Sequence, residues 1–139
     1  MRGGRGRDGL IAGDGAHRSY ARSMRSPFAV RVSELTLTPL DPQPDHDVVA
    51  GDPVVSLLEL STSEDGRVER GVWQITPGVV RDVEADELFV VISGSATIEF
   101  DDGAPALDVG PGDAAILPAG ARTTWTIHET LRKVYQATV

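Results

Sequence analysis

From Pro27 onward, apolar and polar residues alternate in short runs along the chain, a pattern typical of β-strands with one buried face. The runs are rich in Val, Leu and Ile, and none of them has the period of an amphipathic helix. At most one helical turn is expected, near residues 128–130. The expected strands are residues 28–37, 54–61, 68–76, 87–94, 95–100, 105–109, 114–118, 123–127 and 131–139.

Turn-forming residues separate these runs. Gly, Pro and Asp, which tight turns favour, occur at residues 77–78, 101–103, 110–113 and 118–120. Residues 38–53 read as a proline-rich loop, and Gly94 stands between two runs where a tight hairpin is expected. Many short strands separated by such turns predict an all-β sandwich or barrel.

The first 26 residues differ from the rest in composition and charge. Residues 1–25 contain six arginines against two aspartates, a balance of +4, so the remaining residues carry −12 of the net charge of −8. The segment has no periodicity and no continuous apolar core of a signal peptide. An RNA-binding arm is one interpretation of this segment. We expect instead a disordered tail or an incorrectly assigned translation start, with Met24 as a candidate initiator. The folded part is then one domain, residues 27–139.

Composition narrows the classes of function. The 139 residues include no cysteine, so neither a disulfide framework nor a thiolate zinc site is possible. No apolar run approaches the roughly 18 residues of a membrane span, and an acidic domain repels phosphate backbones. We therefore expect a cytoplasmic protein that binds neither membranes nor nucleic acid.

The motifs of the second half resemble those of the cupins. "DELFVVISGSATIEFDDG", "LDVGPGDAAILPAGARTTWTIHETLRKVYQ" and the preceding "GVWQITPG" carry the resemblance, which covers about residues 54–138. More narrowly, they look like the subfamily that includes ureidoglycine aminohydrolase and the ethanolamine-utilisation cupins. The resemblance implies a jelly-roll barrel of two facing antiparallel sheets. It says little about function, because cupins support many chemistries.

The resemblance also identifies the positions of the usual metal ligands. Cupins carry two alternate histidines followed by a glutamate and, seven residues later, a glycine; Glu87 and Gly94 keep the last spacing. The histidine positions fall on Arg81, Val83 and, in the second motif, Thr123. The variant ligand set of ureidoglycine aminohydrolase is not reproduced either.

A transition metal needs several donors that converge on one point, so a divalent metal remains possible but no tightly held one is expected. Replacement ligands are not expected, because Asp82, Glu84 and Asp86 should face solvent. His128 has the wrong alternation to point into the barrel, and His46 lies in a polar loop.

Strand alternation predicts which side chains point into the barrel. Trp73 shares a face with Ile75, Thr123 with Trp125, and Glu87 with Phe89. On the last strand, Lys133 and Tyr135 lie on the same face as Leu131. Together they predict an aromatic pocket with a few polar groups. The candidate ligand-binding residues are Trp73, Arg81, Glu87, Thr123, Trp125, Lys133 and Tyr135.

Structural interpretations compete with these assignments. Each tryptophan is also a natural core residue, and Lys133 could face solvent beside Arg132. Glu87 differs, because a carboxylate within the apolar run "ELFVV" costs free energy unless it is partnered. We therefore regard Glu87 as the candidate catalytic residue.

Three classes of function follow. The first, which we favour, is a cupin that binds a small polar metabolite without a tightly held metal. The second is an enzyme resembling ureidoglycine aminohydrolase, in which Glu87 would be the acid/base and Lys133 with Tyr135 would bind a small nitrogenous or carboxylated substrate. The third is a structural module with a filled barrel. A homodimer is expected in each case, with residues 28–37 as an extra strand covering a sheet edge.

Overall fold

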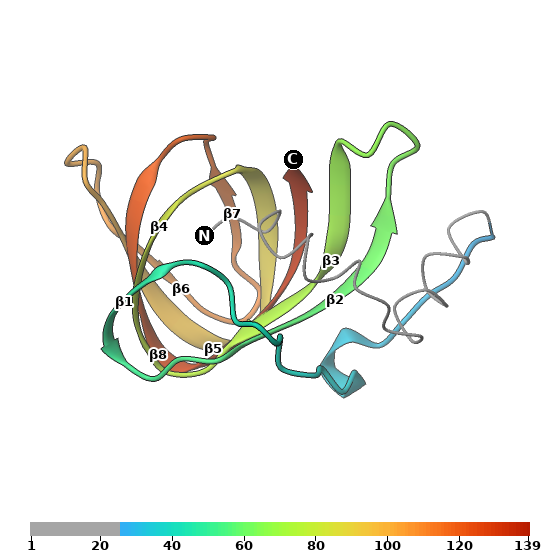
Figure 1. Ribbon diagram of the computed structural model, residues 1–139, viewed down its shortest axis with the longest axis horizontal. Coiled ribbons are helices and arrows are strands. Elements are labelled where there is room, and N and C mark those ends of the chain that lie inside the picture. Colours follow the sequence, from blue (N-terminus) through green and yellow to red (C-terminus); the bar gives the residue numbers. More distant parts are fainter. Residues whose placement is uncertain (1–25) are drawn as a thin grey trace.

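The computed structural model describes residues 26–139, which form a β-barrel with one short 3₁₀ helix (Figure 1). The predicted tail, up to residue 25, and the start at Met24 lie outside the described residues. Within residues 26–139, no helix is both long and apolar enough to cross a membrane. The elements are η3 (Val32–Glu34), β1 (Asp47–Gly51), β2 (Val55–Thr62), β3 (Val68–Ile75), β4 (Gly78–Val83), β5 (Asp86–Phe100), β6 (Leu107–Val109), β7 (Ala114–Leu117) and β8 (Arg122–Thr138).

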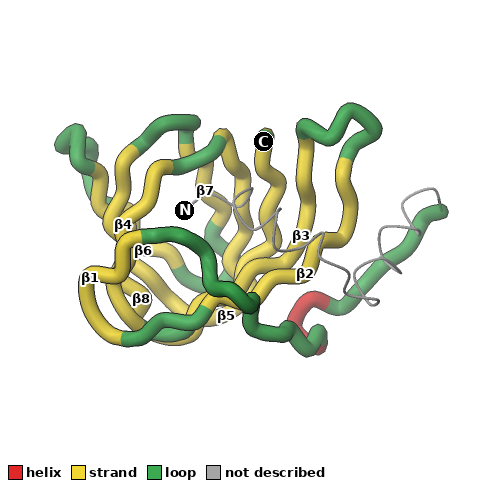
Figure 2. Tube along the Cα trace, in the orientation of Figure 1, coloured by secondary structure: helices red, strands yellow, loops and turns green. Residues whose placement is uncertain are grey.

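Two long antiparallel strands, β5 and β8, run through both halves of the barrel (Figures 1 and 2). The first half of β8 pairs with β4 and the second half with β3. On the other side, the first half of β5 pairs with β7 and the second half with β6. The strand orders are therefore β1-β4-β8-β5-β6 in one half and β2-β3-β8-β5-β7 in the other. This arrangement confirms the predicted all-β barrel of two antiparallel sheets.

Gly94 lies at the bend of β5 and does not form the predicted hairpin. Its φ of +84° belongs to the left-handed region that glycine tolerates, and the register with β8 shifts between Val91 and Ala96. A Cβ at this position would overlap the carbonyl oxygen of Thr130 on β8. The helical turn predicted at residues 128–130 is also wrong, because these residues continue β8 around the same bend.

The chain before β2 differs most from the prediction. Residues 28–37 were expected to form a strand, but they contain η3 and otherwise no regular structure. The reason lies in their hydrogen bonds: the guanidinium group of Arg132 donates to the carbonyl oxygens of Val32 and Leu35, both at 2.8 Å, in place of a strand ladder. Conversely, β1 lies inside the predicted proline-rich loop, and β4 begins at Gly78, the second residue of the predicted Pro77–Gly78 turn.

The core lies between the two halves of the barrel and follows the expected alternation. Glu87, Phe89 and Val91 of β5 are buried, whereas Leu88 and Val90 between them are exposed. The same alternation holds along β8, where Trp125, Leu131 and Tyr135 are buried. Both ends of β8 therefore contribute inward side chains to one continuous core.

Candidate functional site

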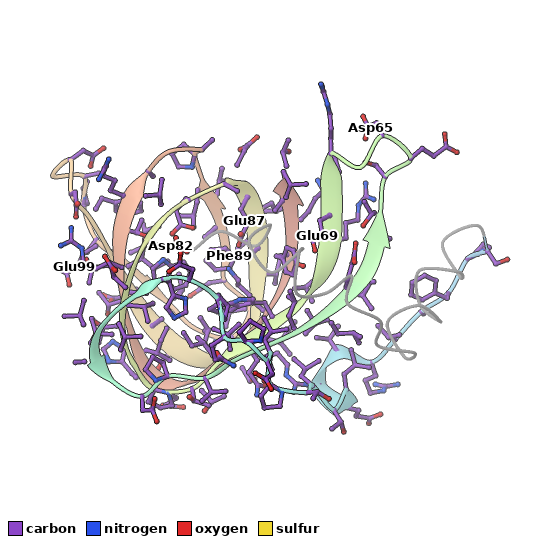
Figure 3. All side chains as sticks on the ribbon, in the orientation of Figure 1. Asp65, Glu69, Asp82, Glu87, Phe89 and Glu99 are labelled. Atoms are coloured by element: carbon purple, nitrogen blue, oxygen red, sulfur yellow. The ribbon has the colours of Figure 1, made fainter. Side chains whose placement is uncertain are left out.

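Six of the seven predicted site residues meet in the barrel interior. β3 supplies one of them, β5 another and β8 the remaining four, and all are at most 4% exposed. Glu87 and the neighbouring Phe89 lie in the middle of the barrel in Figure 3. The six residues are Trp73, Glu87, Thr123, Trp125, Lys133 and Tyr135.

Lys133 and Glu87 form an ion pair at the centre of this group. The distance from Lys133 Nζ to Glu87 Oε2 is 2.6 Å, and both side chains are completely buried. Lys133 therefore does not face solvent, and the cost of burying the carboxylate is offset by a direct partner. The pair gives Glu87 a structural role.

Aromatic rings surround the ammonium group. Lys133 Nζ lies 4.5 Å from the ring centroid of Trp73, 4.6 Å from that of Phe89 and 5.0 Å from that of Trp125. These distances are within the range of cation–π attraction. The rings also contact one another, with centroids 6.3 Å apart for Trp73 and Trp125 and 5.7 Å apart for Phe89 and Trp125. The predicted aromatic pocket is thus filled by a side chain of the protein itself.

Glu84 is a buried site residue that sequence reasoning placed in solvent. It is 2% exposed, and its Oε2 accepts hydrogen bonds from Thr123 Oγ1 at 2.6 Å and Trp125 Nε1 at 2.9 Å. Backbone hydrogen bonds hold it in place: its N–H donates to Ala121 O and its carbonyl accepts from Gly120 N, both at 2.8 Å. No local sequence signal reveals it, because the backbone groups that orient Glu84 lie on a turn far away in the chain. Of its charged neighbours, Asp86 is exposed as predicted.

Tyr135 occupies the other side of the interior, toward β2 and β3. Burial raises the pKa of Tyr135 well above its usual value of 10.0, and the negative charges of Glu69, Glu87 and Glu59 add to the rise. Gly71 on β3 makes room for the phenol, because a Cβ there would lie 2.9 Å from the Tyr135 hydroxyl and 2.6 Å from Leu58 O. The tyrosine is therefore held neutral in a tightly packed position.

Arg81 is the predicted site residue that the structure separates from the others. Its side chain is 53% exposed and forms an ion pair with Asp101 at 3.0 Å. It projects from β4 on the face opposite to the buried Val80. Alternation on β4 could not be used to predict this, because the strand itself was not predicted.

Arg81 instead borders a polar cleft of about 400 Å³. The cleft lies between β4, the approach to β1, and the start of β8; Asp82, on its wall, is labelled in Figure 3. The buried Thr123 also belongs to the lining, so the cleft reaches the residue that donates to Glu84. The lining residues are Asp45, His46, Asp47, Arg81, Asp82, Val83, Asp101, Arg122 and Thr123.

Comparison with known protein families agrees with this architecture. A profile described as the EutQ-like cupin domain matches residues 62–135, more than half of the chain. The chain belongs to this family. The match confirms the predicted cupin superfamily, whereas the narrower resemblance to ureidoglycine aminohydrolase stays a prediction.

Solved structures resemble this EutQ-like cupin at low sequence identity. The Clostridium difficile EutQ protein has a TM-score of 0.64 and 18% identity over 83% of this chain and 89% of its own. A putative ethanolamine utilization protein from Salmonella typhimurium has a TM-score of 0.55 and 18% identity, over 75% of this chain and 98% of its own. A DUF861-family protein of unknown function from Pseudomonas syringae has a TM-score of 0.65 and 24% identity, over 76% of this chain and 45% of its own.

At these identities the likeness shows the fold alone. No curated protein matches the sequence.

The interior of this EutQ-like cupin does not suit the metal that cupins commonly bind. Within residues 26–139, no group of three or more His, Asp or Glu side chains is arranged to hold a metal ion. The ammonium group of Lys133 lies beside Glu87, the one residue that keeps a usual cupin ligand position, and would repel a cation there. His128 points away from the interior, as predicted, and its Nε2 lies 2.8 Å from Thr97 Oγ1 on the surface.

Proposed function

We propose that the protein is a cupin that binds a small polar metabolite in the polar cleft beside Thr123, without a tightly held metal. The main support for this proposal is the size and depth of the cleft. Its volume of about 400 Å³ falls within the usual range of small-molecule sites, and it extends from the surface to a buried polar residue. Thr123 joins the cleft to Glu84 and, through Glu84, to Trp125.

The cleft is a better location for the ligand than the barrel interior. Lys133 and its aromatic neighbours already fill the interior, and the Lys133 and Glu87 side chains are fully buried. A ligand can reach the cleft without displacing a buried ion pair, which would leave an uncompensated charge. The seven predicted binding residues thus separate into an interior group and a cleft group, with Thr123 in both.

Charge in the cleft favours a ligand that donates hydrogen bonds. Four aspartates and two arginines line it, and one of these arginines is paired with Asp101. Carboxylates therefore outnumber guanidinium groups by four to two, and this excess of negative charge favours a cationic amine over a carboxylate.

The proposal can be tested with a panel of small amines, amides, amino acids and carboxylates at millimolar concentration. A true ligand should raise the melting temperature of the protein in a saturable manner. Asp47→Asn, which removes a carboxylate from the cleft, should weaken the effect of an amine, whereas Arg122→Gln, which removes a guanidinium group, should strengthen it. Glu64→Gln, which removes an exposed carboxylate outside the cleft, should leave it unchanged. Binding that none of the cleft variants changes would argue against this location.

An enzyme of the ureidoglycine aminohydrolase type is the second candidate function. It draws support from the close approach of a carboxylate and an ammonium group in Glu87 and Lys133. The same panel can be followed for product formation. Turnover that Glu87→Gln abolishes would favour the enzyme, as would stoichiometric transition metal in the purified protein. If no compound binds or reacts, a structural module with a filled barrel remains.

A further inference from the structure

The environment of the Lys133 ammonium group has the composition of a site for an organic cation. Three aromatic rings approach Nζ within 5.0 Å, and one carboxylate oxygen lies 2.6 Å away. An ammonium group is strongly hydrated in water, so its complete burial requires groups that replace the lost hydration. Ring faces and a carboxylate supply that replacement.

We call the residues that surround this ammonium group the cage: Trp73 from β3, Glu87 and Phe89 from β5, and Trp125 from β8. The lysine contributes only the cation. Both tryptophans of the chain belong to the cage, although aromatic residues make up only 5% of the sequence. Large aromatic side chains are thus concentrated where the cation lies.

The cage is held together by more than the lysine. Trp125 packs against both other rings, at centroid distances of 6.3 Å and 5.7 Å, and its indole N–H is fixed by Glu84 at 2.9 Å. Trp73 and Lys133 lie opposite each other in the pairing of β3 and β8, which defines the backbone separation between ring and stem. Removing the lysine side chain should therefore leave the rings oriented around a vacant space.

We propose that the cage is a binding site for a primary alkylammonium group, and that the chain fills this site with the side chain of its own Lys133. The lysine acts as a tethered ligand, whose high effective concentration excludes a free competitor. This inference does not depend on the cleft, so a failure of the proposed function would not contradict it.

The test is chemical complementation of Lys133→Ala, which removes the three outer methylenes and the ammonium group. Propylammonium matches the missing atoms, and 1-propanol is its neutral counterpart. We expect propylammonium to raise the melting temperature of Lys133→Ala saturably, at concentrations about tenfold lower than 1-propanol. Wild-type protein and Lys133→Met, in which the stem still fills the space, should show no saturable response. A crystal structure should place the bound nitrogen beside Glu87.

Several outcomes would overturn the proposal. If 1-propanol acts as well as propylammonium, the variant contains only an apolar cavity. If the melting temperature of wild-type protein rises equally, the increase is a general effect of the propylammonium salt and not of binding in the cage. Should Lys133→Ala not fold alone, refolding in either compound gives the same comparison, and failure in both would also refute the cage. Adding Glu87→Gln to Lys133→Ala should weaken propylammonium binding about tenfold, and unchanged binding would exclude the carboxylate from the site.

Discussion

Four of the described residues have ionisable side chains that are buried: Glu69, Glu84, Glu87 and Lys133. Because one ammonium group stands against three carboxyl groups, neutral donors supply part of the hydrogen bonding. The hydroxyl of Thr123 and the indole of Trp125 stabilise Glu84, while Lys133 stabilises Glu87. The interior is therefore a polar network as much as a hydrophobic core, and each member depends on its partners.

Tyr135 gives this network a measurable pH dependence. Its pKa is raised in the folded protein, so above pH 10 the unfolded chain loses the phenolic proton while the folded chain keeps it. Tyr135 therefore contributes stability that is fully present below pH 10 and is lost as the pH rises through its folded pKa. Urea unfolding between pH 9 and about 11 should show a steeper loss for the wild type than for Tyr135→Phe. Equal slopes would contradict the neutral, buried phenol.

The sequence identified many residues of this network because alternation works within a strand. Thr123, Trp125 and Lys133 all lie on β8, and their inward orientation follows from a period of two. Glu84 was missed because it lies between β4 and β5, where the alternation is interrupted and long-range backbone pairing decides orientation. The lysine–glutamate pairing spans 46 positions in the chain, a distance over which local patterns carry no information.

At the scale of elements, the two long strands β5 and β8 define the barrel. Each was expected as two shorter strands, because polar or flexible residues interrupt its apolar pattern near Gly94 and near residues 128–130. A hairpin and a bend both favour glycine with positive φ, so the local sequence does not distinguish them. The contact between Gly94 and β8 does distinguish them, and it appears only in three dimensions.

Arg132 attaches the segment around η3 to β8. Its guanidinium group donates to Val32 O and Leu35 O, and also to Gln74 Oε1 at 2.9 Å. Arg132→Ala should cost about 1–3 kcal/mol and increase amide hydrogen exchange in residues 27–40. The control is Arg70→Ala, which removes an exposed arginine bonded to Gln136 and should leave exchange in that segment unchanged. Unaltered exchange in Arg132→Ala would show that other contacts hold the segment.

At the scale of the whole molecule, the outer surface carries an apolar patch on β5 and β7. Leu88 and Ile116 lie opposite each other in the sheet, and Val90 is next on the same face. Their exposures are 41%, 65% and 37%. Among the described residues, β7 pairs only with β5, so the edge beside the patch is open. An apolar face next to an open edge favours self-association.

We expect the homodimer to form through this patch rather than through residues 28–37. Light scattering at micromolar concentration should give the mass of a dimer, and Ile116→Glu should reduce it to that of a monomer. Val49→Glu is the matched control, since Val49 is 57% exposed on β1, away from β5 and β7, and its substitution should leave the dimer intact. A wild-type monomer, or equal effects of the two changes, would contradict this surface.

The position of the two tryptophans has an optical consequence. All indole emission from this chain originates in the cage, because Trp73 and Trp125 are its only tryptophans. Both rings lie beside the Lys133 ammonium group, and Trp125 donates its N–H to the Glu84 carboxyl group, which Thr123 also contacts. A molecule that binds against Thr123 would disturb this hydrogen bond and thereby change the wavelength and intensity of the tryptophan emission. The barrel thus contains an intrinsic, label-free reporter of the occupancy of its own cleft.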